Sequence, residues 1–353
     1  MEKQIRKILE VIESNGYKAY LVGGYVRNYL LGRKNYDVDI CTNALPVDIK
    51  KMFNASKCSY GSVNFMLGKY NVDITTFREE YNYQNRKPEK FVYIDNLEKD
   101  LLRRDFTVNA LCMDKNGKVI DLLGGIDDLN DNKIKMIGNT QVKGKEDPLR
   151  ILRAIRFSTV LNFDLDDDLL NFIKNNYKLV SSLSKNRIKM EMDKILLSKN
   201  YQKGLNYLKI TKVSDALGIE FENVVYVDDL HGMWAQIKAD MPFTNEEKSN
   251  IIKIASGVKK GVIDNFSLYK NGLYINQIVG KILGVNPREV SRKYNHLPIK
   301  TRKDINITCK DIEKIVESPR EIGETYKILE KVILQKKVPN KREDLLKYLN
   351  KRK

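Results

Sequence analysis

Two aspartates stand one residue apart in the sequence YDVDICT, shortly after a glycine-containing segment, LVGGYVRNYLLG. In a β-strand, residues i and i+2 project from the same face, so Asp37 and Asp39 would lie side by side. Two such carboxylates repel each other unless cations lie between them, and Mg²⁺ accepts one or two carboxylates together with phosphate oxygens. The pair therefore suggests Mg²⁺-dependent chemistry on a nucleoside triphosphate, although D-x-D alone is a weak signal that two solvated acids on a strand explain better.

The glycines make the pattern more specific. Gly23 and Gly24 separate a short apolar run, residues 17–22, from a stretch at helical spacing, which predicts a strand-to-helix turn. Free N–H groups at the start of such a helix can cradle phosphate, and Arg27 could reach the same phosphates. Gly-Gly alone is also typical of any tight turn. The combination of GG-x-V-R, L-L-G and D-x-D is far more specific than its parts.

A third carboxylate, Asp73, stands in the sequence VDITTFR. The segment SVNFMLGKYNVDITTF predicts a hairpin that turns near Gly68 and Lys69, and this hairpin could bring Asp73 to the edge that carries the first two aspartates. A carboxylate there could help to deprotonate an attacking hydroxyl. An ordinary surface acid on a strand remains an equally good interpretation.

The elements that must position these residues change along the chain. Up to about residue 135, strand and helix patterns alternate, beginning with an amphipathic helix that carries Ile5, Ile8, Leu9 and Ile12. The polar segment 78–90 has no periodicity and is interpreted as a mobile loop. After about residue 140 almost every segment is helical, including EDPLRILRAIRFSTVL, RIKMEMDKILL, KSNIIKIASGVKK and GETYKILEKVILQ. The pattern predicts an α/β head followed by an extended helical remainder.

Composition restricts the class of protein. The 353 residues carry a formal net charge of +17, and residues 251–353 contribute +13 of it through 24 Lys/Arg against 11 Asp/Glu, which suits a polyanion such as nucleic acid.

The four cysteines have no metal-ligand or disulfide spacing, and only two histidines are present, so a histidine-based metal centre is improbable. We find neither a signal peptide nor a membrane-spanning run and expect a cytoplasmic protein with reduced thiols. The sequence leaves monomer and homodimer open.

Three motifs together resemble one family. LVGGYVRNYLLGRKNYDVDICT resembles the signature of the nucleotidyltransferases that comprise bacterial-type tRNA CCA-adding enzymes and poly(A) polymerases. RRDFTVNA (103–110) resembles the second motif of that family, and EDPLRILRAIRF (146–157) resembles its nucleotide-selecting motif. The similarity continues through RIKMEMDKILL and reappears in LPIKTRKDINIT and VPNKREDLLKYL, so that it covers most of the chain and includes a tail of the Gram-positive type.

The resemblance implies a role for each matched residue. Asp37 and Asp39 would hold the Mg²⁺ ions, with Asp73 as a third catalytic candidate. Asp105 would engage the ribose 2′-hydroxyl, and Asn109 would support the same pocket. The nucleotide-binding residues implied in this way are Gly24, Arg27, Arg104, Asp105, Asn109, Asp147, Arg150, Arg153 and Arg156.

Hydrogen-bonding chemistry agrees with the implied selection of bases. A carboxylate accepts from an exocyclic amine, whereas a guanidinium donates to a ring nitrogen or a carbonyl. An Asp147/Arg150 pair could therefore select cytosine and adenine against uracil and guanine without a template. The spacing predicts that both residues lie on one face of a helix. A routine helix-surface ion pair is the alternative without the motif.

The family resemblance also implies an architecture. The fold class would be α+β: a nucleotidyltransferase head with a small mixed β-sheet and flanking helices, followed by an elongated all-α neck, body and tail. The corresponding ranges are 1–140, 141–199, 200–270 and 271–353. Three positions depart from the family pattern. Asn28 replaces the usual aspartate after V-R, Asn85 stands in the flexible loop where an acid is common, and Cys309 occupies a tail position that is often glycine.

The expected reaction is the addition of C, C and A to the 3′ end of tRNA from CTP and ATP, by two-metal in-line attack with release of pyrophosphate. A poly(A) polymerase, or an enzyme that adds only A or only CC, would share the head. The tail argues against a poly(A) polymerase, and the full-length loop argues against a CC-adding enzyme. A catalytically inactive RNA-binding module is a further alternative, against which the intact Asp37 and Asp39 argue.

Overall fold

The computed structural model describes residues 1–55, 58–59, 61–84, 87–316 and 318–352. The chain divides into two compact units, residues 1–218 and 219–353. Strands lie almost entirely in the first unit, and the second is helical, which confirms the α+β fold class. The finer division into head, neck, body and tail stays a prediction.

A seven-stranded mixed sheet forms the centre of the first unit, in the order β3-β4-β5-β2-β1-β8-β9. Its strands are β1 (Ala19–Val22), β2 (Asp37–Thr42), β3 (Cys58–Ser59), β4 (Ser62–Leu67), β5 (Tyr70–Thr76), β8 (Cys112–Met113) and β9 (Val119–Ile120). The pair β2–β5 is parallel, and the other neighbours are antiparallel. The predicted strands at 17–22 and in YDVDIC and the predicted hairpin at Gly68 are thus confirmed.

Helices and short connecting elements flank this sheet. They are α1 (Lys3–Ser14), α2 (Gly24–Leu30), α3 (Pro46–Phe53), α4 (Leu97–Leu102), a 3₁₀ turn η1 (Thr107–Asn109) and α5 (Gly125–Asn130). Helix α1 buries the four predicted residues Ile5, Ile8, Leu9 and Ile12 against the unit. The apolar residues of β2, Val38 and Ile40, are buried as the alternation predicted, so the two aspartates between and beside them face outward.

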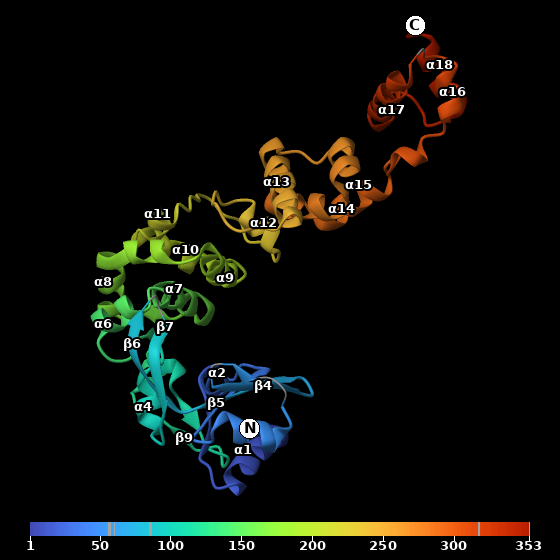
Figure 1. Ribbon diagram of the computed structural model, residues 1–353. Helices are drawn as coiled ribbons and strands as arrows, with labels where there is room; N and C mark the ends of the chain where they lie inside the picture. The colour runs from blue at the N-terminus through green and yellow to red at the C-terminus, as the bar shows by residue number, and fades with distance from the viewer. Residues whose placement is uncertain (56–57, 60, 85–86, 317, 353) are drawn as a thin grey trace. The chain divides into compact units, whose positions relative to one another are not determined.

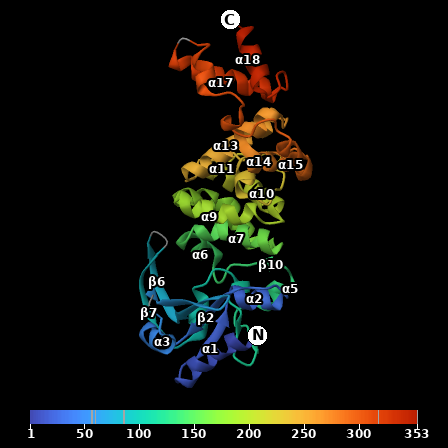
Figure 2. The same ribbon diagram turned by 90° about the vertical axis from the view of Figure 1, so that its right-hand side faces the viewer.

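Residues 78–84 and 87–93 form two strands that pair with each other, so the interpretation of segment 78–90 as a loop was wrong, while its mobility stays a prediction. Strands β6 (Arg78–Gln84) and β7 (Lys87–Tyr93) pair with each other in a separate antiparallel ladder. Both views show this hairpin running from the sheet toward helices α6 (Thr140–Glu146) and α7 (Leu149–Leu161) (Figures 1 and 2). Backbone hydrogen bonds between the two strands hold them together, although their sequences lack hydrophobic alternation. Asn85 lies outside the described residues.

A layer of helices completes the first unit and supports α7, which carries three of the predicted arginines. It consists of α8 (Asp167–Asn176), η2 (Tyr177–Ser182), α9 (Lys185–Leu196), α10 (Tyr201–Ile210) and α11 (Val213–Leu217), with a two-stranded parallel ladder of β10 (Lys133–Ile134) and β11 (Asp164–Leu165). The α7 side chains Leu152 and Ile155 are fully buried in this layer. The helical segments predicted here are confirmed.

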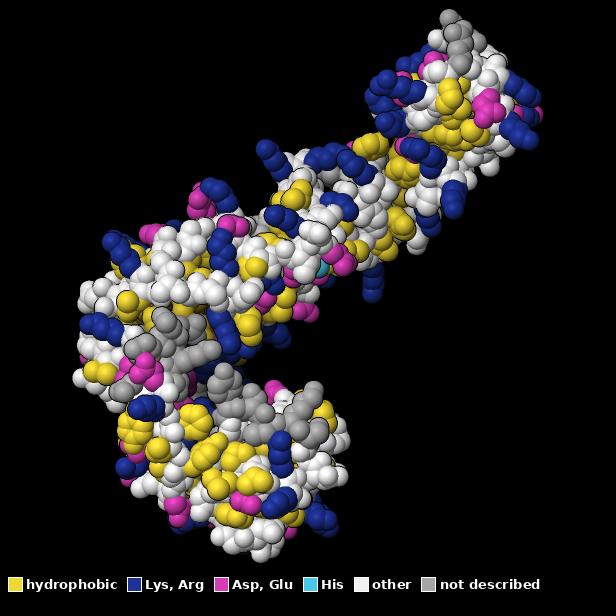
Figure 3. Space-filling model, in the orientation of Figure 1, with side chains coloured by type: hydrophobic (Ala, Val, Ile, Leu, Met, Phe, Trp, Pro, Cys, Tyr) yellow, Lys and Arg dark blue, Asp and Glu magenta, His cyan; other side chains and the backbone are white. Residues whose placement is uncertain are grey.

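The second unit is built from α12 (Leu230–Trp234), α13 (Asn245–Lys260), α14 (Asn265–Ile282), α15 (Pro287–Asn295), η3 (Arg302–Asp304), α16 (Cys309–Glu313), α17 (Pro319–Leu334) and α18 (Arg342–Asn350). Arg342 donates to both carboxylate oxygens of Asp311 and thereby ties α18 to α16. On the face drawn in Figure 3, many Lys and Arg side chains gather over the C-terminal helices. In the part of the chain that the structure describes, no helix is long and apolar enough to cross a bilayer.

The packing of α10 against α7 and α9 can be tested at Gly204. A Cβ atom on Gly204 of α10 would lie 2.5 Å from Oγ1 of Thr159 in α7 and 2.6 Å from Cγ2 of Ile195 in α9. We therefore expect Gly204→Ala to lower the free energy of unfolding by about 1–3 kcal/mol through overpacking. Gly323 of α17 has nothing within 4 Å of its Cβ position, so Gly323→Ala should raise that free energy by up to about 1 kcal/mol. Urea unfolding checks both variants, and equal effects at the two sites would contradict this packing.

Candidate active site

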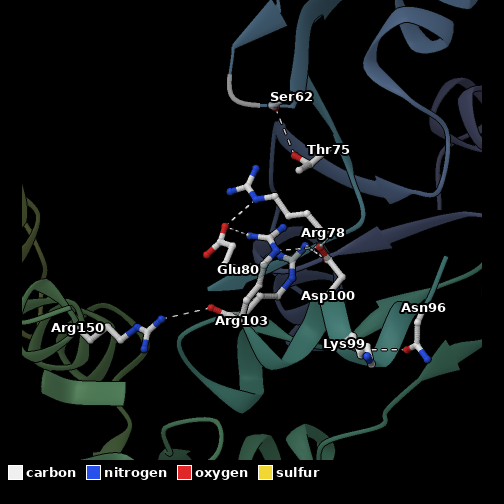
Figure 4. Close-up of polar contacts among 10 residues, drawn as sticks. Ser62, Thr75, Arg78, Glu80, Asn96, Lys99, Asp100, Arg103 and Arg150 are labelled. Carbon is white, nitrogen blue, oxygen red and sulfur yellow. Dashed lines mark hydrogen bonds and ion pairs between the residues drawn. The ribbon is translucent and has the colours of Figure 1, made fainter. Parts of the chain in front are cut away.

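Three carboxylates form a ledge on adjacent strands of the sheet. Asp37 and Asp39 project from one face of β2, and Asp73 of β5 stands directly opposite Asp39 in the parallel register. Ser62 donates a hydrogen bond to Asp73, and Asn71 donates one to Asp37 with an Nδ2–Oδ1 distance of 3.2 Å. Figure 4 shows Ser62 in contact with Thr75, the next outward residue along β5. The predicted proximity of Asp73 to the pair is confirmed.

The ledge has the electrostatic character of a cation site. Burial raises the pKa of Asp39, the negative charges of Asp73 and Asp37 raise it further, and Arg104 acts in the opposite direction. In the described ranges no group of three or more His, Cys, Asp or Glu side chains is arranged so that it could hold a metal ion by itself. Mg²⁺ needs only one or two protein carboxylates when phosphate supplies the other oxygens, so the pair fits an ion that arrives with a nucleotide.

The glycine turn lies against this ledge. Gly23 has φ +70°, a left-handed conformation that favours glycine, and α2 begins at Gly24. A Cβ atom on Gly23 would lie 3.4 Å from Oδ2 of Asp39 and 3.6 Å from Nη1 of Arg104. These are ordinary contact distances, so the turn lies directly against the Asp39 carboxylate and the Arg104 guanidinium.

Arginines gather around a single phenyl ring next to the turn. The guanidinium carbons of Arg27, Arg153 and Arg156 lie 5.2, 5.4 and 4.0 Å from the ring centroid of Phe157. Arg27 donates to Asn109 and to Asn28, so the neutral amide at position 28 holds the arginine that precedes it. Burial lowers the pKa of Arg27 to about 10, which leaves the side chain positively charged near neutral pH.

Asp105 is held in place from three sides. Nε of Arg153 donates to its Oδ2 at 2.8 Å, while Nδ2 of Asn109 and the backbone N–H of Phe106 donate to its Oδ1 at 3.0 and 2.8 Å. Burial alone would raise the pKa of Asp105, but Arg153 and these hydrogen bonds lower it below the ordinary value. The site therefore contains a fixed carboxylate beside the arginines.

Asp147 does not lie on a helix, which corrects the prediction that it shares a helical face with Arg150. It adopts an extended conformation (φ −138°, ψ +95°) between α6 and α7. The cause is Pro148, because the proline ring disfavours the helical region for the preceding residue. Oδ1 of Asp147 accepts a hydrogen bond from the N–H of Leu149 at 3.0 Å, and Arg150 is fixed by the carbonyls of Lys143 and Arg103.

Most of the predicted nucleotide-binding residues line one cavity of about 370 Å³. Its lining comprises Gly23, Gly24, Arg27, Asp39, Arg103, Arg104, Asp105, Asn109, Asp147, Arg150, Arg153 and Phe157. Arg156 is not part of this lining; it contacts Phe157 and forms an ion pair with Glu191 at 2.8 Å. Asp37 and Asp73 also lie outside the lining and continue from Asp39 along the ledge.

Sequence reasoning missed the group that supports the arginines of the second motif. Asp100 of α4 is fully buried and accepts hydrogen bonds from the backbone N–H of Arg78 and from the side chains of Arg103 and Arg104. Glu80 of the hairpin pairs with Arg78 and Arg103, while Arg150 donates to the carbonyl of Arg103 (Figure 4). An acid three and four residues before two arginines on a helix was the available signal.

Comparison with known proteins gives matches along the whole chain. Residues 19–135 match the poly(A) polymerase head domain, residues 162–218 match a probable RNA- and SrmB-binding site of polymerase A, and residues 235–349 match the putative tRNA nucleotidyltransferase domain 2. The CCA-adding enzyme of Ligilactobacillus salivarius is 35% identical, and the alignment covers 98% of this chain and 95% of that enzyme. The CCA-adding enzyme of Staphylococcus haemolyticus is 31% identical, with coverage of 98% and 97%.

Solved structures resemble the protein over its full length. The CCA-adding enzyme of Bacillus stearothermophilus in complex with CTP is 25% identical and gives a TM-score of 0.84, with 100% of this chain and 98% of that chain covered. The Thermotoga maritima CCA-adding enzyme complexed with tRNA shares the fold, with a TM-score of 0.69 at 20% identity and coverage of 100% and 96%.

The Asp105–Arg153 pair makes stability depend on pH. Asp105→Asn removes the charge that Arg153 faces, so we expect the free energy of unfolding at pH 7 to fall by about 3 kcal/mol. Because folding lowers the pKa of Asp105, its contribution is complete above the unfolded value near 3.9 and is lost as pH falls through the folded value. Urea unfolding of wild type and variant between pH 7 and pH 3 checks this. Exposed Asp127→Asn is the control. If the difference in free energy of unfolding between wild type and Asp105→Asn stayed constant or grew toward pH 3, the pairing would be contradicted.

Proposed function

The chain belongs to the CCA-adding enzymes, a family of tRNA nucleotidyltransferases, and we propose that it adds C, C and A to the 3′ end of tRNA from CTP and ATP without a nucleic-acid template. The observation that carries the proposal is one cavity in which base-reading, ribose-binding and phosphate-binding candidates stand beside the carboxylate ledge. Full-length similarity to enzymes of this activity supports it.

The reaction is an in-line displacement. The 3′-oxygen of the tRNA attacks the α-phosphate of the incoming nucleotide, a new oxygen–phosphorus bond forms, and the bond to the β-phosphate breaks so that pyrophosphate leaves. Asp73, which Ser62 orients, accepts the proton of the hydroxyl directly or through water. Gly24, Arg27 and Arg104 bind the triphosphate, and Arg153 and Arg156 complete the positive surroundings of the nucleotide. Most of the rate enhancement then comes from positioning and charge stabilisation.

Asp37 and Asp39 would hold the cofactor, which we propose to be Mg²⁺. When bound, two such ions would stabilise the charge on the attacking and leaving oxygens. Burial and, after it, the charges of Asp73 and Asp37 raise the pKa of Asp39, and a neighbouring cation would offset both effects, which supports this proposal.

Selection of the base rests on Asp147 and Arg150. The Asp147 carboxylate accepts from the exocyclic amine that cytosine and adenine share, and Arg150 donates to a ring nitrogen or carbonyl. Both residues line the cavity, although the first precedes the helix and the second lies in it. Arg150 donates to the backbone carbonyl of Lys143 in α6 and to that of Arg103 in the second motif. These contacts fix the orientation of its guanidinium before a nucleotide binds. Asp105 and Asn109 bind the ribose.

The remaining chain serves the RNA. We propose the head at 1–140, the neck at 141–199, the body at 200–270 and the tail at 271–353. The net charge of +13 on residues 251–353 supports contact of the tail with the tRNA backbone by charge and shape. A tRNA substrate also supports a cytoplasmic location.

End-labelled tRNA that lacks its last three nucleotides tests the proposal. We expect addition of two nucleotides with CTP alone, addition of three with CTP and ATP, and no efficient use of UTP or GTP. Asp37→Ala should abolish incorporation and leave tRNA binding nearly unchanged, whereas exposed Asp127→Ala should retain activity. Long adenylate tails would identify a poly(A) polymerase instead. Arrest after the addition of CC would identify an enzyme that adds only CC, and activity restricted to tRNA that already ends in CC would identify an enzyme that adds only A. Undiminished incorporation by Asp37→Ala would refute the assignment of the site.

A further inference from the structure

A second cavity of about 500 Å³ lies in the first unit beside the ledge, and none of the roles above uses it. It is bounded by the start of α1, by α2 with the segment that follows it, and by the β4–β5 turn. The lining side chains that matter here are Tyr29, Arg33, Lys34, Tyr36, Lys69 and Tyr70. Its volume is in the range of cavities that hold a ligand the size of a nucleotide.

The cavity combines aromatic rings with positive charge. Tyr29 and Tyr36 are 47% and 50% exposed, so their rings are available for stacking. The rings of Tyr36 and Tyr70 have centroids 6.2 Å apart, and Nζ of Lys69 lies 5.5 and 5.1 Å from those centroids. Glu2 also lines the cavity and forms an ion pair with Lys69 at 3.6 Å, so three cationic side chains, Arg33, Lys34 and Lys69, face one carboxylate. Lys34 is exposed at the same opening. Alternating aromatic and basic groups are the means by which proteins bind single-stranded nucleic acid with little sequence preference.

The cavity adjoins the proposed reaction centre. Tyr36 immediately precedes Asp37, the first residue of β2. Asn35 lines this cavity, and its Nδ2 lies 3.9 Å from the Cβ position on Gly24, which lines the nucleotide cavity. Arg33 donates to the carbonyls of Val160 and Leu161 and so fixes this wall to the end of α7. The wall that separates the two cavities is therefore short and anchored.

We propose that this second cavity holds a nucleotide of the single-stranded RNA 3′ end, one or two positions from the reactive hydroxyl, with the base stacked on Tyr36 and the adjoining phosphate beside Lys34 and Lys69. The proposal rests on the proposed function. The incoming nucleotide is already assigned to the first cavity. The other substrate is the RNA, whose chain must lead away from its reactive 3′ end at the ledge, so the RNA is the occupant we assign to the second cavity. The positive groups distinguish this cavity from a site for an apolar ligand.

The stacking contact is tested by Tyr36→Leu, with Tyr36→Phe as the matched control that keeps the ring. Loss of one base–aromatic stack should weaken binding of tRNA lacking its last three nucleotides about tenfold, with KM for CTP unchanged. Tyr36→Phe should bind as wild type does. Lys34→Gln should lower the slope of log affinity against log salt by about 0.7, and exposed Lys7→Gln should leave that slope unchanged.

Abasic RNA identifies the occupant. The same tRNA with an abasic site at its last or second-last nucleotide should lose affinity for wild type at one of these positions, and Tyr36→Leu should cause no further loss there. Fully additive losses at both positions, or a change in KM for CTP without a change in RNA affinity, would overturn the proposal. A wild-type protein that incorporates neither C nor A would instead refute the proposed function. Thermal melting of each variant shows whether folding is retained.

Discussion

The repulsion between Asp37 and Asp39 is the constraint on which the rest of the site depends. The two carboxylates stand on one face of β2 because Val38 and Ile40 are buried on the other, and a third, Asp73, is held beside them by the β2–β5 register. Burial makes the negative charge of Asp39 costly, and no rotation of β2 can separate the pair without exposing the buried residues. The sheet thus maintains an arrangement that nearby positive charge stabilises in addition to the hydrogen bonds from Ser62 and Asn71.

Positive charge is concentrated on the arginines around Phe157, which are also fixed by the fold. Arg27, Arg153 and Arg156 surround Phe157, and the buried acids Asp105 and Glu191 balance only part of their charge. A nucleoside triphosphate with its metal ions would complement both groups, because its phosphates face the arginines and its cations face the carboxylates. In the proposed reaction, binding and catalysis would use the same preorganised charges, which need not rearrange as charge develops in the transition state.

The sequence was sufficient wherever local pattern and motif determine position. The alternation in YDVDIC predicted the strand that carries Asp37, and the hairpin predicted at Gly68 offered a way for Asp73 to reach the same edge. The parallel β2–β5 register that places Asp73 opposite Asp39 was not predicted. The pairing of β6 with β7 could not be predicted from hydrophobic alternation, because these strands pair through the backbone, the backbone N–H of Arg78 binds Asp100, and the Glu80 carboxylate pairs with Arg103. The position of Asp147 was missed because helical spacing was given more weight than the proline that follows. The cluster around Asp100 depends on contacts between distant segments, which spacing alone does not reveal.

The most direct test is a crystal structure with CTP and Mn²⁺ in place of Mg²⁺, since anomalous scattering locates the metal independently of the nucleotide. The account predicts metal peaks at the carboxylates of Asp37 and Asp39, with the triphosphate beside Gly24 and Arg27 and the cytosine edge at Asp147 and Arg150. A triphosphate bound away from these carboxylates, or a metal peak elsewhere on the first unit, would contradict it.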